Sequence, residues 1–222
     1  MSYYILKQNL DEEVISKACP QVDCLTMFEA HSINSWYLFN PAPNLSFMLR
    51  HGANLTDVLQ DFTINSRGFL ISPKVKKVLN NFRLMRHQYF SAPVKTKDGS
   101  HNYSWLHLCD LELTHQINFA ESVFFRTEFT FREEQIKLDS FDHYQELKSQ
   151  DKTAAFGVEL DEIVLSDKFD QSLDLFTFLP FDDNVYITQR LVNAFVDNDI
   201  QGFVFERTDK IRNTNANKSY SA

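Results

Sequence analysis

Two segments of the chain share one arrangement, and this repeat limits the possible folds more than any other feature. Each begins with a short apolar run rich in strand formers, at 69–71 and 185–187. Ser72 or Thr188 follows, and both are preferred helix N-caps because a side-chain oxygen accepts a hydrogen bond from a free backbone N–H. Neither segment carries an obvious reactive group. The pattern therefore predicts two strand–helix units that serve as scaffold.

The apolar positions of the two helices indicate which residues enter the core. Val75 and Leu79 lie four residues apart in the first unit, as do Leu191 and Phe195 in the second, so each pair shares one helical face. Pro73 stands at the first helical position, where its missing N–H costs nothing. We expect the four apolar residues to be buried.

Strand and turn signals account for most of the remaining chain. Asp98-Gly99 is a two-residue hairpin signal, and Pro93 places the strand before it at an edge or a bulge. A short helix is expected behind Asn54, within 54–62, and the polar stretch 145–152 is expected to be a linker or an exposed loop. Further strands are predicted at 3–6, 88–96, 101–109, 155–166, 173–180 and 203–205.

Helical and strand patterns are mixed along the chain, so the sequence predicts an α+β fold. Its expected parts are mixed and antiparallel sheets, two strand–capped helix–strand units and a central β-hairpin. With 43% hydrophobic and 23% charged residues among 222, wholesale disorder is excluded. We expect one domain over 1–209, in which 67–209 has a clearer pattern of strands and helices than the N-terminal part, 1–66. The polar residues 210–222 are expected to be a disordered tail.

Motifs for nucleotide binding or hydrolysis are missing from the sequence. The five glycines stand apart from one another, whereas phosphate-binding loops need several close together. Trp105, His107 and Cys109 alternate along one strand and share a face. A zinc site needs three or four ligands, and only His107 and Cys109 qualify. We expect no metal, no cofactor and a half-buried scaffold strand here.

The three cysteines form an odd and sparse set, which favours a reducing cytoplasm over a disulfide framework. The N-terminus lacks the basic start and the apolar length of a signal peptide. No apolar run approaches the ~18 residues that span a bilayer. The sequence thus predicts a cytoplasmic protein without a membrane partner.

Negative charge is concentrated in the C-terminal half of the chain. Residues 151–209 hold 13 Asp and Glu against 4 Lys and Arg, whereas 1–150 hold 17 against 15. Such a surface repels nucleic acid and attracts a basic partner, although an acidic surface also serves solubility alone. The residues expected to form this surface are Asp161, Glu162, Asp167, Asp170, Asp174, Asp182 and Asp183. The last two are expected in an exposed loop.

The segment 173–209 contains the apolar strand LDLFTFL, the loop PFDDN, the strand VYIT, a helix that follows it, and the strand GFVF. This layout resembles the C-terminal signature of a family of bacterial immunity proteins, immunity family eleven of the polymorphic-toxin systems. The central segments 68–82 and 89–108 are also similar to that family, as are 117–124 and the opening YYIL. The resemblance implies a protein that binds and neutralises a cognate toxin delivered between competing bacteria. It implies no catalytic residues.

Two other functions stay open at this point. An adaptor or chaperone that escorts a secreted effector needs a binding surface of the same kind, so the sequence does not separate escort from inhibition. A small enzyme of unrecognised class would use carboxylates, or His107 with Cys109. We expect an immunity protein without enzymatic activity, whose partner is a toxin with a basic surface such as that of a nuclease.

Overall fold

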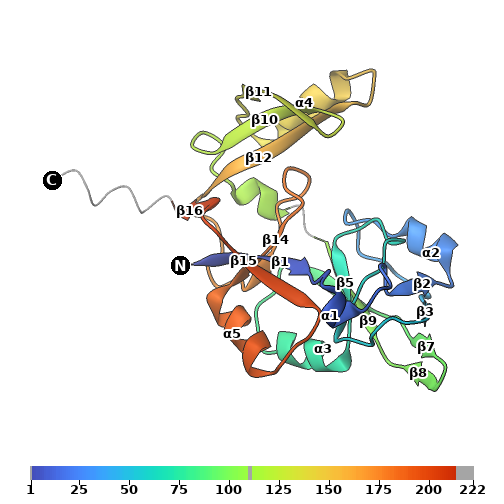
Figure 1. Ribbon diagram of the computed structural model, residues 1–222. Helices are drawn as coiled ribbons and strands as arrows, with labels where there is room; N and C mark the ends of the chain where they lie inside the picture. Colours follow the sequence, from blue (N-terminus) through green and yellow to red (C-terminus); the bar gives the residue numbers. More distant parts are fainter. Residues whose placement is uncertain (1, 110–111, 214–222) are drawn as a thin grey trace.

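The computed structural model describes residues 2–109 and 112–213. Within these ranges the chain forms five α-helices, one 3-10 helix and 16 strands. The strands make four sheets of four strands each, and only two of the strand pairs within these ranges are parallel. The fold is α+β, as the sequence predicts. Figure 1 shows a body that holds the N-terminus, and a smaller part that projects from it.

The first sheet has the order β13-β14-β1-β15, with β13 Leu175–Phe176, β14 Val185–Thr188, β1 Tyr3–Gln8 and β15 Phe203–Thr208. The second is β4-β5-β9-β6, with β4 Val58–Leu59, β5 Gly68–Ile71, β9 Ser104–Leu108 and β6 His87–Ser91. The third is β2-β3-β7-β8, with β2 Val22–Cys24, β3 Phe47–Leu49, β7 Val94–Thr96 and β8 Gly99–His101. The fourth is β11-β10-β12-β16, with β11 Phe131–Ile136, β10 Val123–Glu128, β12 Phe156–Leu165 and β16 Ile211–Asn213. The helices are α1 Glu12–Ile15, α2 Met27–Ser32, α3 Pro73–Leu79, α4 Phe141–Gln150, α5 Gln189–Asp197 and the 3-10 helix η1 Glu112–Gln116.

The two strand–helix units lie at the centres of the first two sheets and are built alike. β5 leads into α3, where the Ser72 hydroxyl accepts a hydrogen bond from the Val75 N–H at 3.3 Å. β14 leads into α5, where the Thr188 hydroxyl accepts one from the Leu191 N–H at 3.4 Å. The four helical residues expected in the core are at most 1% exposed, which confirms that prediction.

One aspartate closes each unit. The Ser72 N–H and hydroxyl donate to the carbonyl and the Oδ1 of Asp57, both at 2.8 Å. The Thr188 N–H and hydroxyl donate in the same way to Asp174, at 3.1 and 2.7 Å. Each aspartate thus ties the start of a short strand, β4 or β13, to the helix cap at the end of the strand beside it.

The two units also bind each other reciprocally. The N–H of Gln201, which follows α5, donates to Oδ2 of Asp57 at 3.1 Å. The N–H of Arg83, which follows α3, donates to Oδ2 of Asp174 at 3.0 Å. Helices α3 and α5 are in contact, side by side beneath the sheets in Figure 1. The repeat in the sequence therefore encodes two similar units that complete one another, which explains why the pattern occurs twice.

The second sheet is buried on both faces. Phe69 and Ile71 of β5 belong to the core that includes α3 and the first sheet, whereas Leu70 belongs to a second core shared with the third sheet. A strand covered on both faces is apolar without alternation. This position explains the continuous apolar run at 69–71.

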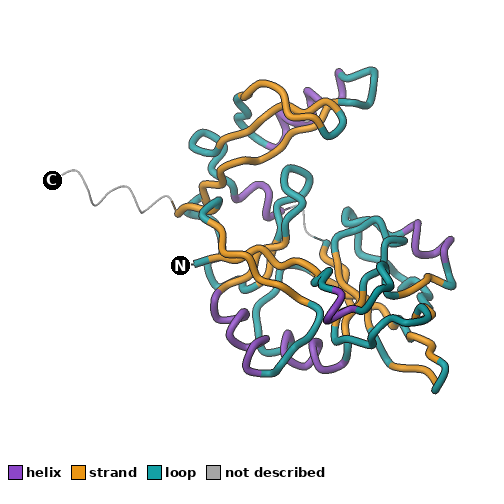
Figure 2. The backbone as a smooth tube through the Cα atoms, in the orientation of Figure 1, coloured by secondary structure: helices purple, strands orange, loops and turns teal. Residues whose placement is uncertain are grey.

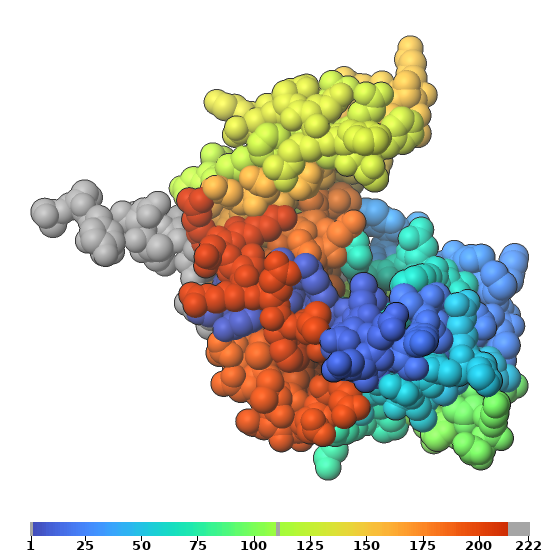
Figure 3. Space-filling model, viewed as in Figure 1, coloured from blue at the N-terminus to red at the C-terminus, as the bar shows by residue number. Residues whose placement is uncertain are grey.

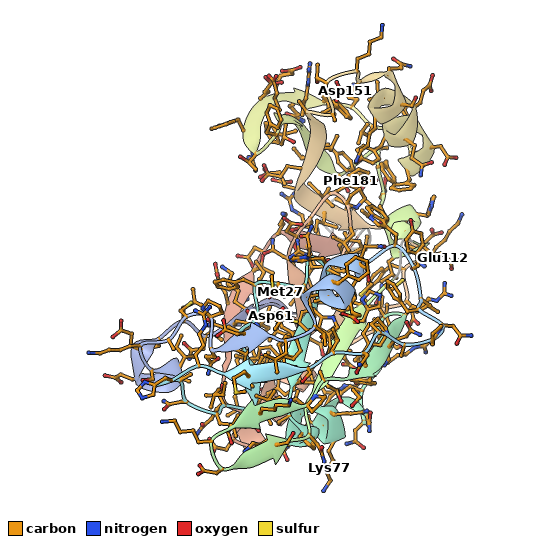
Figure 4. All side chains as sticks on the ribbon, turned by 90° about the vertical axis from the view of Figure 1, so that its right-hand side faces the viewer. Met27, Asp61, Lys77, Glu112, Asp151 and Phe181 are labelled. Atoms are coloured by element: carbon orange, nitrogen blue, oxygen red, sulfur yellow. The ribbon has the colours of Figure 1, made fainter. Side chains whose placement is uncertain are left out.

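Residues 119–165, which contain β10, β11, α4 and β12, form the projecting part, here called the upper lobe (Figures 1 and 2). Phe181 of the body enters it. Its ring centroid lies 4.8 Å from that of Tyr144, 5.5 Å from that of Phe124 and 5.9 Å from that of Phe141. In Figure 4, Phe181 lies at the narrow neck between the upper lobe and the body. Because it is only 2% exposed, Phe181 holds the two parts together by apolar packing.

Two elements expected from local patterns are wrong. The helix expected within 54–62 is absent, and Val58–Leu59 is instead strand β4, because it pairs with β5 and is held by Asp57. The linker expected at 145–152 lies largely in α4, whose side chains Phe141 and Tyr144 are buried against the upper sheet. In both cases contacts distant in sequence override the local signal.

The hairpin expected from Asp98-Gly99 is present, but its two-residue turn is Lys97-Asp98, because Thr96 of β7 pairs with Gly99, the first residue of β8. Pro93 separates β6, an edge strand of the second sheet, from β7 in the third, so the run expected as one strand passes between two sheets. The tail expected at 210–222 is wrong at its start, because β16 pairs in parallel with β12. Its remaining residues, 214–222, lie outside the described residues.

Candidate protein interface

Two of the seven acidic residues expected to form a binding surface are buried structural groups. Asp174 is 1% exposed in the unit described above, and Asp182 is 5% exposed. The Asp182 carboxylate accepts hydrogen bonds from the Tyr186 hydroxyl and, at 2.9 Å, the Asn184 N–H, and it lies 2.8 Å from the Lys210 ammonium. The expectation that Asp182 is exposed is therefore wrong, because its loop folds over its own carboxylate.

Four of the others each face an arginine. Asp161 lies 2.7 Å from Arg132, Asp170 lies 2.8 Å from Arg83, Glu162 pairs with Arg212 and Asp183 pairs with Arg67. Asp167 is exposed, and no partner is found for it in the described part of the chain. Arginine guanidinium groups neutralise most of these carboxylates. The seven acids therefore provide much less free negative charge than their number suggests.

Exposed apolar side chains gather instead in the N-terminal part of the body. Residues 24–49 contain a single Asp, Glu, Lys or Arg, namely Glu29. Within and near this stretch, Phe28 is 87% exposed, Phe62 67% and Tyr37 61%. The set of exposed residues, here called the aromatic surface, is Leu25, Met27, Phe28, Trp36, Tyr37, Leu38 and Phe62. Figure 4 shows Met27 below the neck.

The backbone beneath the aromatic surface is firmly held. Ala30 and Ile33, at most 1% exposed, pack with Ile64 in the second core. The Arg67 N–H donates to the Ser35 hydroxyl at 2.7 Å, which ties the segment after α2 to β5. Helical periodicity then turns Phe28 away from the core while Ala30 faces it, because residues two apart lie on opposite sides of a helix. The exposed aromatic residues are thus displayed on a fixed support, which lowers the entropy lost on binding.

A cleft separates the aromatic surface from the upper lobe, and Figure 3 shows the recess between the two parts. It consists of two hollows that share Pro180 and Asp183. The lower hollow, about 350 Å³, is lined by Asn34, Ser35, Trp36, Ile64, Asn65, Ser66, Arg67, Leu179, Pro180 and Asp183. The upper hollow, about 470 Å³, includes Phe129, Thr130, Tyr144, Lys148, Glu159 and Lys210. We call the two together the interlobe cleft.

His107 is not part of a surface site. It is fully buried, its ring stacks on Phe90 at 5.2 Å between centroids, and its Nε2 lies 3.0 Å from the Tyr37 carbonyl oxygen. Burial lowers the pKa of His107, so the ring is neutral near pH 7. The expected scaffold strand is thus fully rather than half buried here. No group of three or more potential metal ligands occurs among the described residues.

No family model matches the chain, and no curated protein sequence is significantly similar to it. Among the helices of the described residues, none has the length and apolar character needed to cross a membrane.

The sequence contained one usable signal for the aromatic surface. The near absence of charge over 24–49, together with TMF and WYLF, indicates either a core segment or an apolar surface. Only the structure decides between them, by packing Ala30 and Ile33 inward and leaving Phe28 and Tyr37 in solvent.

Proposed function

We propose that this protein is an immunity protein, which binds a cognate bacterial toxin and neutralises it by direct contact. The observation that carries the proposal is the aromatic surface on its fixed support. The centres of protein interfaces are depleted of charge and enriched in Trp, Tyr, Phe and Met, and the segment 24–49 has this composition. Large apolar side chains left exposed in one segment are a mark of interaction sites.

The nature of the surface changes the binding mode expected from the sequence. Most of the seven acids expected to bind the toxin already face arginines, so attraction of a basic toxin is weakened. Desolvation of Phe28, Tyr37 and Trp36 then supplies most of the binding free energy, as buried aromatic anchors do at other interfaces. Binding through this surface depends weakly on salt concentration.

The test uses the product of the adjacent gene, which the proposal expects to be the toxin. Co-expression of the two is expected to restore growth, and the purified pair to form a complex that buries about 1,600 Å² or more. Growth without an isolable complex would favour an enzyme that removes the toxin's product. A complex without restored growth would favour an escorting adaptor.

Single substitutions then locate the contact. Phe28→Ala and Tyr37→Ala are each expected to weaken the complex tenfold or more, since side chains that anchor an interface contribute at least about 2 kcal/mol. Val196→Ala is the matched control, because Val196 is 63% exposed on α5, away from α2 in Figure 1. Equal affinity of all three variants and the wild type would contradict the proposal that the aromatic surface binds the toxin.

A further inference from the structure

The interlobe cleft carries chemistry that the folded chain itself leaves unused. Ser66 Oγ, which lines the lower hollow, is buried and has no hydrogen-bond partner within the described residues. The side chains of Asn65 and Thr130 are exposed on opposite sides of the cleft, and no hydrogen bond is found for either in the same part of the chain. Unpaired donors and acceptors in a recess match the N–H and C=O groups of a polypeptide backbone.

The two sides of the cleft also offer apolar contacts. Trp36, 44% exposed, borders the lower hollow, and Phe129, 71% exposed, borders the upper one. Leu179 and Pro180 lie between them in the loop that carries Phe181. Trp36 also belongs to the aromatic surface, so a partner bound there extends directly into the cleft.

The lower hollow presents one carboxylate to solvent. Arg67 and Asp183 are the ionisable residues among those that line it, and they form an ion pair through Oδ1 of the aspartate. The Asp183 side chain is 85% exposed, whereas that of Arg67 is only 32% exposed. An incoming group therefore meets the carboxylate, whose second oxygen is open to a further donor. A lysine or arginine side chain is the complementary group.

We infer that the interlobe cleft receives an extended segment of the partner protein that carries a lysine or arginine, and that this basic side chain binds Asp183. The inference rests on the proposed function, since it specifies how the toxin is held. The backbone of the segment pairs with the exposed side chains of Asn65 and Thr130, and its apolar side chains contact Trp36 and Phe129. The interface then has two parts, the ionic contact at Asp183 in the interlobe cleft and the apolar contact at the aromatic surface. Salt weakens the first much more than the second.

The test compares Asp183→Asn with Asp167→Asn in the purified complex, at low and at high salt. Asp167 is a matched control because it is exposed, lacks a partner among the described residues and does not line the cleft. We expect Asp183→Asn to raise the Kd tenfold or more at low salt and to abolish most of its salt dependence, while Asp167→Asn leaves both unchanged. Thermal melting of each variant, which should match the wild type, excludes unfolding as the cause.

A photo-crosslinking amino acid at Asn65 gives an independent measurement. Crosslinks to the partner are expected there, and none from the same probe at Lys97 in the β7–β8 turn. If both Asp variants bind like the wild type and Asn65 does not crosslink, the inference about the cleft is wrong while the proposed function stands. If the wild-type protein forms no complex with the toxin, the proposed function itself fails.

Discussion

Asp174 allows the sharpest test of how the two units are held together. Its carboxylate is 1% exposed and accepts hydrogen bonds from the Thr188 hydroxyl at 2.7 Å, the Arg83 N–H at 3.0 Å and the Arg190 Nε at 3.1 Å. Asp174→Asn keeps the shape and one acceptor oxygen. It replaces the other oxygen by an NH₂ group, which faces donors and cannot accept from them.

The loss of stability in Asp174→Asn follows from the donors that lose their acceptor. Hydrogen bonds to a charged group contribute about 1.5–3 kcal/mol each, and removal of one partner of a buried ion pair costs about 3–5 kcal/mol. The Arg190 side chain is 67% exposed, so water solvates its charge once the partner is lost. We therefore expect Asp174→Asn to lower the free energy of unfolding by about 2–4 kcal/mol, below the full cost of a buried pair.

Asp57 supplies the matched comparison in the other unit. Its ammonium partner, Lys74, lies 3.3 Å away, and the Asp57 side chain is 15% exposed rather than 2% as in Asp174. Asp57→Asn should thus cost about half as much, ~1–2 kcal/mol. Urea denaturation at pH 7 measures both values.

The stability contributed by Asp174 is expected to depend on pH in a definite direction. Burial alone raises the pKa of Asp174, but hydrogen bonds from Arg190, Thr188 and the Arg83 N–H outweigh it and hold the pKa below its ordinary value. A carboxylate with a lowered pKa in the folded state stabilises the fold above its unfolded pKa of about 3.9, and the contribution is lost as pH falls through the folded pKa. The difference between wild type and Asp174→Asn should be complete at pH 6–7 and shrink below about pH 4. A loss under ~0.5 kcal/mol at pH 7, or one independent of pH, would refute the reasoning.

Further substitutions test other parts of the fold. Leu79→Ala and Phe195→Ala should each cost about 2–5 kcal/mol in denaturant melts, since both side chains are at most 1% exposed, and a change below ~0.5 kcal/mol would contradict the packing of α3 and α5. Phe181→Ala should cost about 3–5 kcal/mol and speed amide hydrogen exchange more in the upper lobe than in the body; uniform acceleration would argue against its role at the neck. Asp182→Lys should destabilise the protein, because the new charge is buried and faces Lys210, whereas Asp183→Lys should cost much less, because the Asp183 side chain is 85% exposed and water screens the new charge from Arg67; equal melting temperatures would show that Asp182 is solvated after all.

Local sequence signals predicted the parts of the fold that depend on near neighbours. The caps Ser72 and Thr188 act within three residues, and the apolar face from Val75 to Leu79 spans one helical turn, so both were correct. The α+β class follows from the same short-range patterns. The immunity function remains a proposal, supported by the resemblance of 173–209 and by the aromatic surface.

Contacts between distant segments decided the rest. Val58 and Leu59 carry a helix-like local pattern, yet they form a strand because Asp57 binds Ser72 and Gln201, 15 and 144 residues away in sequence. The acids at 161–183 look like free charge in the sequence, but their neutralising arginines come from other elements. Periodicity and charge count depend only on the identity of each residue and of its neighbours in the sequence. Whether a carboxylate meets an arginine, or an aromatic ring meets water, depends on which surfaces the fold brings together, and that is a property of the tertiary structure alone.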